Sequence, residues 1–184
     1  MKQQPTDGWR QNPTLSGGGA LFEGGIHWIS LLAHLGLEVT EVRALSPARP
    51  GEAERSVQLL LRYEQGTVAS LTYSWEVPSP LKGLRLSRAY GTDGSAAFES
   101  NGLFFLAMGR RWRMRATSSD LLGYHAMFRD LLAAIRTGRA PRYALRDARR
   151  DLELIAQAYR DAGLDENGRD VETTRTESGQ GGGR

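Results

Sequence analysis

Between Val39 and Ala116, apolar and polar residues alternate in short runs separated by turns. Such alternation predicts β-strands with one buried face, because successive side chains of a strand point to opposite sides of the sheet. Turn signals such as Gly91-Thr92-Asp93-Gly94 and Asn101-Gly102 are only a few residues long, which favours antiparallel neighbours. The predicted strands are residues 39–45, 56–63, 68–75, 84–90, 96–99, 103–108 and 111–115.

Apolar residues at helical spacing flank this block on both sides. The predicted helices run from Leu21 to Leu35, with Gly36 as a stop, from Asp120 as N-cap to Thr137, and from Leu145 to Ala162. The side chains predicted to be buried are Leu21, Phe22, Ile29 and Leu32 in the first helix, Leu121, Tyr124, Phe128, Leu131, Leu132 and Ile135 in the second, and Ala148, Leu152, Ile155 and Tyr159 in the third.

One helix, then a block of strands, then two helices predict the α+β class. The simplest architecture is one large open β-sheet, predominantly antiparallel or mixed, with the helices packed on one face. The expected organisation is an irregular arm over residues 1–16, the α+β domain over residues 17–163 and a disordered tail over residues 164–184. The tail carries Ser, Thr, Gly and charge, with almost no large apolar side chain.

The strands carry more large apolar side chains than one layer of helices is expected to cover. This surplus is at Leu59, Leu61, Leu71, Tyr73 and Trp75. Because exposed apolar patches are typical of protein interfaces, a homo-oligomer through the sheet face is expected.

Composition argues against several classes of protein. The chain has 184 residues, 40% of them hydrophobic, as is normal for a soluble globular domain. It has no Cys, so a disulfide framework and thiolate chemistry are excluded. The polar N-terminus argues against a secretory signal, and no apolar run approaches the ~20 residues needed to span a bilayer. A cytoplasmic location without membrane contact is therefore expected.

Charge raises the question of nucleic acid, because the formal net charge is +3. The one dense basic cluster comprises Arg110, Arg111, Arg113 and Arg115. Alternating strand positions favour a solvated edge strand, where charge discourages aggregation. Trp112 is the only aromatic residue among these arginines, whereas single-stranded nucleic acid is usually bound by several stacking aromatics. No nucleic-acid partner is expected.

Glu23 and His27 are the residues best suited to chemistry. Four positions apart on a helix, their side chains point to one face and can touch. A neighbouring carboxylate fixes the tautomer and orientation of an imidazole, which makes the pair a candidate general acid–base. The same spacing is also common in ordinary pairs on helix surfaces, so the residues alone leave both interpretations open.

Glycines surround this pair. Gly24 and Gly25 lie inside the helical pattern, where each costs about 1 kcal/mol relative to Ala, so a ligand or a neighbouring strand is expected to approach closely. The triplet Gly17-Gly18-Gly19 either exposes backbone N–H groups to an anion or forms an ordinary loop. No metal site is expected, because the only other histidines are His34 and His125 and no HExxH pattern occurs.

Several stretches resemble the second domain of Gfo/Idh/MocA oxidoreductases, whose sequence is approximately WR-x-x-P followed by GGG-x-L-x-D-x-G-x-H-x-x-D. The matching stretches are Trp9-Arg10, Pro13, Ser16-Gly17-Gly18-Gly19, Glu23-Gly24-Gly25-Ile26-His27, Leu35-Gly36, Gly66, Trp75, Gly91-Thr92-Asp93-Gly94-Ser95, and Phe128 to Gly138 leading to Asp147 and Tyr159. In this order they cover roughly residues 8–163.

The resemblance implies part of an NAD(P)-dependent oxidoreductase that acts on a sugar, cyclitol or related hydroxyl or carbonyl compound. In the complete enzymes, an N-terminal Rossmann domain binds NAD or NADP, and the second domain binds the substrate and supports oligomers. By position, His27 resembles the catalytic histidine, and Glu23 takes the place of the usual Asp. Arg10 and Trp9 occupy the loop that borders the substrate.

Three features depart from the family's pattern. Glu23 is one methylene longer than Asp, and Ser30 stands where an Asp is common. Only sixteen residues precede Gly17, and they contain no glycine fingerprint of a dinucleotide-binding fold. The family's catalytic Lys is missing with that fold. The chain alone is therefore predicted to bind no cofactor and to be inactive, and a separate Rossmann-domain chain is an expected partner.

Two functions remain open at this point. The first is the substrate-binding and oligomerisation domain of such an oxidoreductase. The alternative is a non-catalytic small-molecule-binding or assembly module derived from the same family. The departures at Glu23 and Ser30 favour the module, whereas the retained His27 favours the oxidoreductase.

Overall fold

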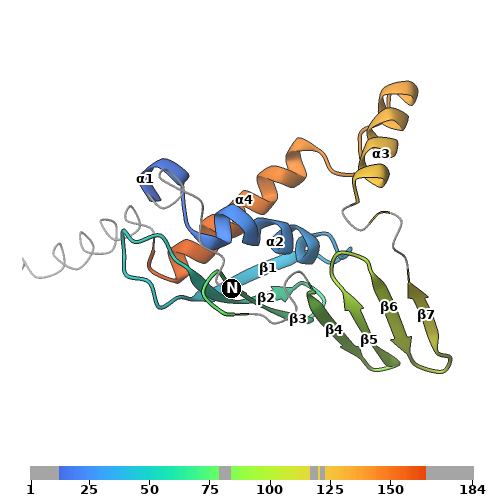
Figure 1. Cartoon of the computed structure of the whole chain (residues 1–184), viewed down its shortest axis with the longest axis horizontal. Coiled ribbons are helices and arrows are strands. Elements are labelled where there is room, and N and C mark those ends of the chain that lie inside the picture. Colours follow the sequence, from blue (N-terminus) through green and yellow to red (C-terminus); the bar gives the residue numbers. More distant parts are fainter. Residues whose placement is uncertain (1–12, 79–83, 117–119, 121–122, 165–184) are drawn as a thin grey trace, which may run out of the picture. The chain divides into compact units, whose positions relative to one another are not determined.

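The computed structural model describes residues 13–78, 84–116, 120 and 123–164 (Figure 1). The chain divides into two compact units. The first combines Met1–Pro78 with Leu145–Arg184, and the second is Ser79–Ala144. Helices and antiparallel strands occur in both units, so the predicted α+β class is confirmed.

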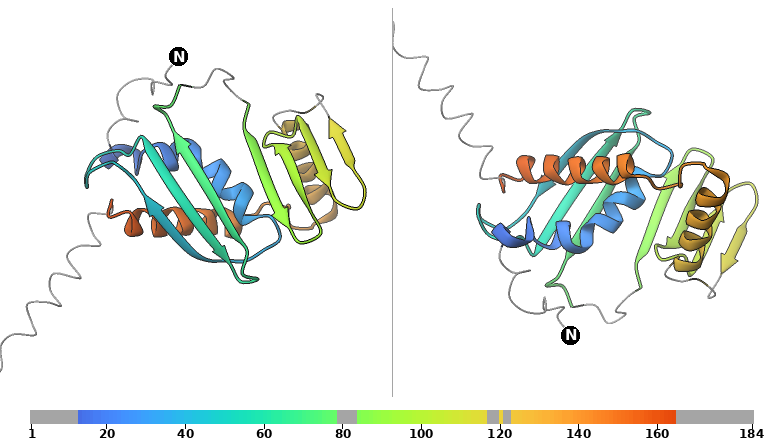
Figure 2. Two further views of the ribbon diagram at one scale, coloured as in Figure 1. Left: turned by 90° about the horizontal axis from the view of Figure 1, so that it is seen from below. Right: turned by 90° about the horizontal axis from the view of Figure 1, so that it is seen from above.

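A three-stranded antiparallel sheet forms the centre of the first unit. Its strands, in the order β1-β2-β3, are β1 (Val39–Leu45), β2 (Ser56–Tyr63) and β3 (Val68–Ser74). The helices are α1 (Pro13–Ser16), the π-helix η2 (Leu21–Gly25), α2 (Ile26–Ala33) and α4 (Leu145–Asp161). Helix α2 continues directly from η2, and α2 and α4 lie side by side over one face of the sheet (Figure 2).

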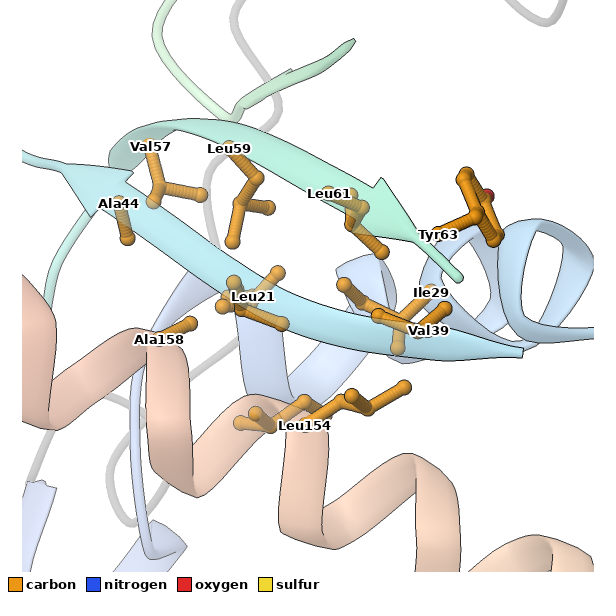
Figure 3. Close-up of a cluster of buried hydrophobic side chains, with 12 residues drawn as sticks. Leu21, Ile29, Val39, Ala44, Val57, Leu59, Leu61, Tyr63, Leu154 and Ala158 are labelled. Atoms are coloured by element: carbon orange, nitrogen blue, oxygen red, sulfur yellow. The ribbon is translucent and has the colours of Figure 1, made fainter. Parts of the chain in front are cut away.

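The hydrophobic core lies between these helices and the sheet (Figure 3). The leucine and isoleucine side chains with no exposed surface are Leu21, Ile29, Leu59, Leu61 and Leu154. Full burial of such a side chain contributes about 1.5–3 kcal/mol to folding. The buried side chains predicted for residues 21–35 are confirmed, because Phe22 and Leu32 also pack against this core.

The buried face of α4 matches the predicted one only in part, because Ile155 is buried and Tyr159 packs against the core but Leu152 does not. Leu152 is 44% exposed, whereas Asp151, Leu154 and Ala158 are buried. Asp151 explains the error, because a carboxylate in the middle of the buried face breaks the apolar spacing from which such a face is inferred. Within the first unit, the Asp151 carboxylate lies 3.3 Å from Nε2 of His34, directly after α2.

The apolar surplus inferred from the strands is wrong, because the helices cover it. Leu59, Leu61 and Trp75 are buried, and Leu71 and Tyr73 pack against the core. The opposite face of the sheet is mainly polar. Its cross-strand pairs include the hydrogen-bonded Ser56–Ser74 and Gln58–Thr72 and the ion pair Glu41–Arg62, beside the half-exposed Leu60 and the exposed Val68.

The second unit contains a four-stranded antiparallel sheet in the order β4-β5-β6-β7. The strands are β4 (Leu86–Gly91), β5 (Gly94–Glu99), β6 (Phe104–Met108) and β7 (Arg113–Ala116). The described strands thus form two sheets, where one large sheet was predicted. The connection between β3 and β4 contains Pro78 and Pro80, which have no backbone N–H to donate to a strand ladder.

Helix α3 (Tyr124–Thr137) completes the second unit. Its N-cap is Gly123 and not the predicted Asp120, although the Asp120 carboxylate accepts hydrogen bonds from the backbone N–H groups of His125 and Ala126. The apolar face of α3 is not packed: Tyr124, Phe128, Leu131, Leu132 and Ile135 are 44–69% exposed. Leu121, predicted to share that face, lies outside the described residues.

Candidate functional site

Glu23 and His27 lie one turn apart, where η2 continues into α2. Both side chains are exposed, while Leu21, Gly25 and Ile29 on the same helical segment are buried. The two predicted catalytic side chains therefore lie on the solvent side of a helix whose other side is fixed in the core. Trp9 and Arg10, predicted to border the substrate, lie outside the described residues.

The His27 imidazole makes no hydrogen bond or ion pair with any residue that the structure describes. Its imidazole is not held by Glu23 in this arrangement, although the two positions are suitably spaced. Catalytic hydrogen bonds are often long or misaligned without a bound substrate and tighten only in the reacting complex. The geometry thus places an imidazole and a carboxylate one helical turn apart, both exposed to solvent.

The end of the glycine triplet and the residues that follow it contact a buried carboxyl group of the chain itself, that of Glu54. Glu54, in the connection between β1 and β2, is 2% exposed, and its Oε1 accepts a 2.8 Å hydrogen bond from the backbone N–H of Leu21. The Tyr159 hydroxyl on α4 donates to the same oxygen at 2.9 Å and accepts from the N–H of Gly19 at 3.2 Å. The backbone N–H of Ala20 donates to the carbonyl of Glu54 at 2.7 Å.

Burial dominates the electrostatics of this cluster. It raises the pKa of Glu54, against the opposing effect of hydrogen bonds from Leu21 and Tyr159 that favour the charged form. It also raises the pKa of the Tyr159 phenol, and the Glu54 charge raises that pKa further. Tyr159 thus stays protonated and serves as a hydrogen-bond donor to the carboxylate.

The open alternatives for the glycines are resolved by this geometry. A Cβ at Gly19 would collide with the backbone and carboxylate of Glu54, and one at Gly18 would collide with the Tyr159 hydroxyl. A Cβ at Gly24 would collide with the hydroxyl of Tyr73 on β3. The close approach expected at Gly24 is therefore made by a neighbouring strand.

The glycine-rich segment before η2 does not fit the pyrophosphate of a dinucleotide. A pyrophosphate is held by free N–H groups of a glycine-rich segment at a helix start. In this chain Gly19, Ala20 and Leu21 donate those groups to Glu54 and Tyr159. The glycine-rich segment is already occupied by protein atoms.

Metal ligands, hollows and membrane-spanning helices are the other features of each unit that bear on function. Among the described residues, no three His, Asp or Glu side chains gather as a metal site would require. A hollow of about 740 Å³ occurs in the second unit, lined by Tyr90, Ser95, Met108, Arg110 and Arg113 among others. Over the part of the chain that is described, no helix is long and apolar enough to cross a bilayer.

Comparison with known proteins identifies the family. A family model described as the GFO/IDH/MocA C-terminal domain matches residues 1–97, more than half of the chain. The chain belongs to the Gfo/Idh/MocA family. The predicted resemblance is thereby confirmed for the segment that contains Glu23, His27 and Glu54. No curated protein matches the chain.

Solved structures of Gfo/Idh/MocA oxidoreductases share the fold. Aldose–aldose oxidoreductase from Caulobacter crescentus, solved with glycerol, is 25% identical with a TM-score of 0.71, over 86% of this chain and 50% of that one. UDP-N-acetylglucosamine 3-dehydrogenase from Acidithiobacillus ferrooxidans is 24% identical with a TM-score of 0.66, over 79% and 48%. Levoglucosan dehydrogenase, solved with NADH and levoglucosan, is 17% identical with a TM-score of 0.72, over 89% and 53%. The chain thus spans about half the length of these structures.

Glu54 and Tyr159 were missed as partners of the glycine-rich segment by reasoning from sequence. Glu54 stands in a polar connection, Gly51-Glu52-Ala53-Glu54-Arg55, in which nothing distinguishes it from Glu52. Tyr159 was assigned only to the buried face of its helix. The available signal was the glycine triplet itself, because glycine is typical of positions where another group approaches the backbone closely.

Proposed function

We propose that this chain is the substrate-binding and oligomerisation domain of an NAD(P)-dependent oxidoreductase that acts on a sugar, cyclitol or related hydroxyl or carbonyl compound. The observation that carries the proposal is the exposed position of His27 on a helix whose opposite face is fixed in the core. Membership of the Gfo/Idh/MocA family and the 25% identity to an aldose–aldose oxidoreductase support the same substrate class.

His27 is the proposed proton acceptor or donor at the reacting oxygen of the substrate. Glu23, one turn earlier, is the carboxylate that stabilises the protonated imidazole once a bound substrate draws the two side chains together. Trp9 and Arg10 are proposed to border the substrate. A positioned imidazole of this kind typically contributes about 10²–10⁴-fold to the rate of a proton transfer.

The dinucleotide is assigned to a Rossmann domain other than the fold described here. This assignment is supported by the N–H groups of Gly19, Ala20 and Leu21, which donate to Glu54 and Tyr159 and are therefore not free to bind a phosphate. The family's catalytic Lys belongs to that other domain. Alone, the 184-residue chain is proposed to be inactive.

We also propose a homo-oligomer through a sheet face. The residues that support it are in the second unit and not on the strands 56–63 and 68–75 from which it was predicted. Leu86 and Tyr90 on β4 share one face of the second sheet with Met114 on β7. All three are at least 63% exposed. Exposed apolar side chains that share a strand face are typical of interfaces, and light scattering would measure the assembly directly.

The alternative is a non-catalytic small-molecule-binding or assembly module. The observation that favours it is the absence of any hydrogen bond from His27 to the described residues, together with Ser30 in place of a common Asp. Such a module would keep the fold without relying on the imidazole.

Replacing His27 by Ala in an enzyme reconstituted with a dinucleotide-binding domain separates the two functions. His27→Ala is expected to lower kcat/KM by about 100-fold or more, because the proton transfer loses its positioned group. His125→Ala, at an exposed histidine of α3, is the matched control and should leave the rate unchanged. Unchanged turnover in His27→Ala would establish the module instead.

A further inference from the structure

The segment that leads into the His27 helix is held from the side by buried Glu54. Its carboxylate accepts from the N–H of Leu21, the first residue of η2, at 2.8 Å, and its carbonyl accepts from the N–H of Ala20 at 2.7 Å. The first N–H groups of a helical segment have no partner within it, and a carboxylate there complements their partial positive charge. Glu54 therefore fixes the backbone at the point where the helical segment begins.

Tyr159, on α4, hydrogen-bonds both partners of this contact, the Glu54 carboxylate and the glycine-rich segment. Its hydroxyl donates to Glu54 Oε1 at 2.9 Å and accepts from the N–H of Gly19 at 3.2 Å. Burying a carboxylate is unfavourable unless hydrogen bonds replace its water, and this phenol supplies one of them. One hydroxyl thus joins α4, the β1–β2 connection and the glycine-rich segment.

Gly18 and Gly19 pack so closely against Tyr159 and Glu54 that no larger residue fits at either position. Side chains at Gly18 or Gly19 would overlap Tyr159 or Glu54. The glycines, the carboxylate and the phenol therefore form one tightly packed set, which has no room for a side chain at Gly18 or Gly19.

One helical turn of backbone connects Gly19, which Tyr159 and Glu54 hold in place, to Glu23 of the proposed site. The N–H of Glu23 donates to the carbonyl of Gly19 at 3.0 Å, and His27 follows one turn later. We infer that Glu54 and Tyr159 are positioning residues, which set the direction in which Glu23 and His27 are presented to a substrate. The inference rests on the proposed function, because a substrate at His27 is part of that proposal. The effect of Glu54 and Tyr159 on the backbone can nevertheless be measured without any reaction.

The far end of the same helix offers a matched control. The Tyr63 hydroxyl, on a residue only 1% exposed, donates to the carbonyl of Leu32 at 3.0 Å. Tyr159→Phe and Tyr63→Phe each remove one buried hydroxyl and leave the ring in place. They differ in which end of the segment from η2 to α2 is released.

Hydrogen exchange of the complete 184-residue chain, read by mass spectrometry, tests the local effect. Tyr159→Phe is expected to speed exchange over residues 19–27 by about tenfold and to leave residues 56–63 unchanged, as for a local opening that loses a charge-assisted hydrogen bond. Tyr63→Phe should speed exchange only near residues 32–36. A uniform increase across the first unit in Tyr159→Phe, or no increase over residues 19–27, would overturn the inference.

The imidazole signals of His27 in NMR spectra give the second measurement, with those of His125 as internal reference. Tyr159→Phe and Glu54→Gln are expected to shift or broaden the His27 signals, whereas Tyr63→Phe leaves them in place. If the His27 signals stay in place in both variants, Glu54 and Tyr159 do not position His27 and the inference is wrong. Because neither measurement needs turnover, failure of the proposed oxidoreductase function in the His27→Ala experiment would be recognised separately.

Discussion

The Tyr159 hydroxyl donates a 2.9 Å hydrogen bond to the carboxylate of Glu54, 105 residues earlier in the chain. Through this bond the last helix of the first unit reaches the connection between β1 and β2, and from there the glycine-rich segment before η2. The position of Glu23 and His27 thus depends on contacts from two distant parts of the sequence.

The unfolding free energy should depend on pH through Glu54. Burial raises the pKa of this carboxyl in the folded state, so the folded protein keeps the proton to higher pH than the unfolded chain does. The stability from that proton is complete below the unfolded pKa, about 4.3, and is lost as pH rises through the folded pKa. Urea unfolding of the wild type and Glu54→Gln should show the wild type losing stability relative to the variant as the pH rises above the unfolded pKa. Parallel profiles would contradict this assignment.

Gly19→Ala should destabilise the first unit by about 1–3 kcal/mol, the usual cost of forcing an extra carbon into a packed site. The added Cβ would meet the backbone of Glu54, which cannot rotate away as a flexible side chain would. Gly91→Ala is the control, because its Cβ would meet only one atom at 3.7 Å, an ordinary contact. Thermal unfolding measures both variants, and equal melting temperatures would contradict the steric argument.

Leu59 and Leu60 are adjacent but point to opposite faces of β2. Leu59 has no exposed surface, whereas Leu60 is 48% exposed on the polar face. Leu59→Ala should cost about 2–5 kcal/mol, through lost burial and a cavity, and Leu60→Ala less than about 1 kcal/mol. Denaturant titration of the two variants tests the strand register directly. A reversed order would mean that β2 is shifted by one residue.

The isolated chain should bind NADH and NADPH only weakly. The N–H groups of Gly19 and Leu21 that could hold phosphate oxygens already donate to Tyr159 and Glu54. Isothermal titration calorimetry with each dinucleotide should show no micromolar affinity. Micromolar binding by the lone chain would refute the assignment of the cofactor to another domain.

The sequence pattern predicted the local elements of the first unit closely. Strands β1 and β2 match the predicted residues 39–45 and 56–63, because alternation and flanking turn residues act over a few positions. In the second unit, β7 begins at Arg113 where residue 111 was predicted, and β4 at Leu86 where residue 84 was predicted. Strand ends are set by pairing partners, which a local pattern does not contain.

Contacts between distant residues were not predictable in the same way. Buried Asp151 near His34 changed the inward face of α4, and a charged residue in a core position has no periodic signature. Glu54 in the candidate site was missed for a related reason, since only the fold brings it to the glycine triplet. That Glu23 and His27 lie on one exposed helix face was predictable, because it follows from their spacing of one helical turn.

The π-helical turn η2 determines which residues of this segment face outward. Leu21 and Ile29 are eight positions apart and both have no exposed surface. In a regular α-helix, eight steps of about 100° would leave these side chains about 80° apart. The wider turn takes up one extra residue and narrows the angle between these two buried side chains. A natural relative that lacks one residue between positions 21 and 25 would have a regular α-helical turn there. Such a deletion should occur together with compensating changes at Gly24, Gly25 and Tyr73.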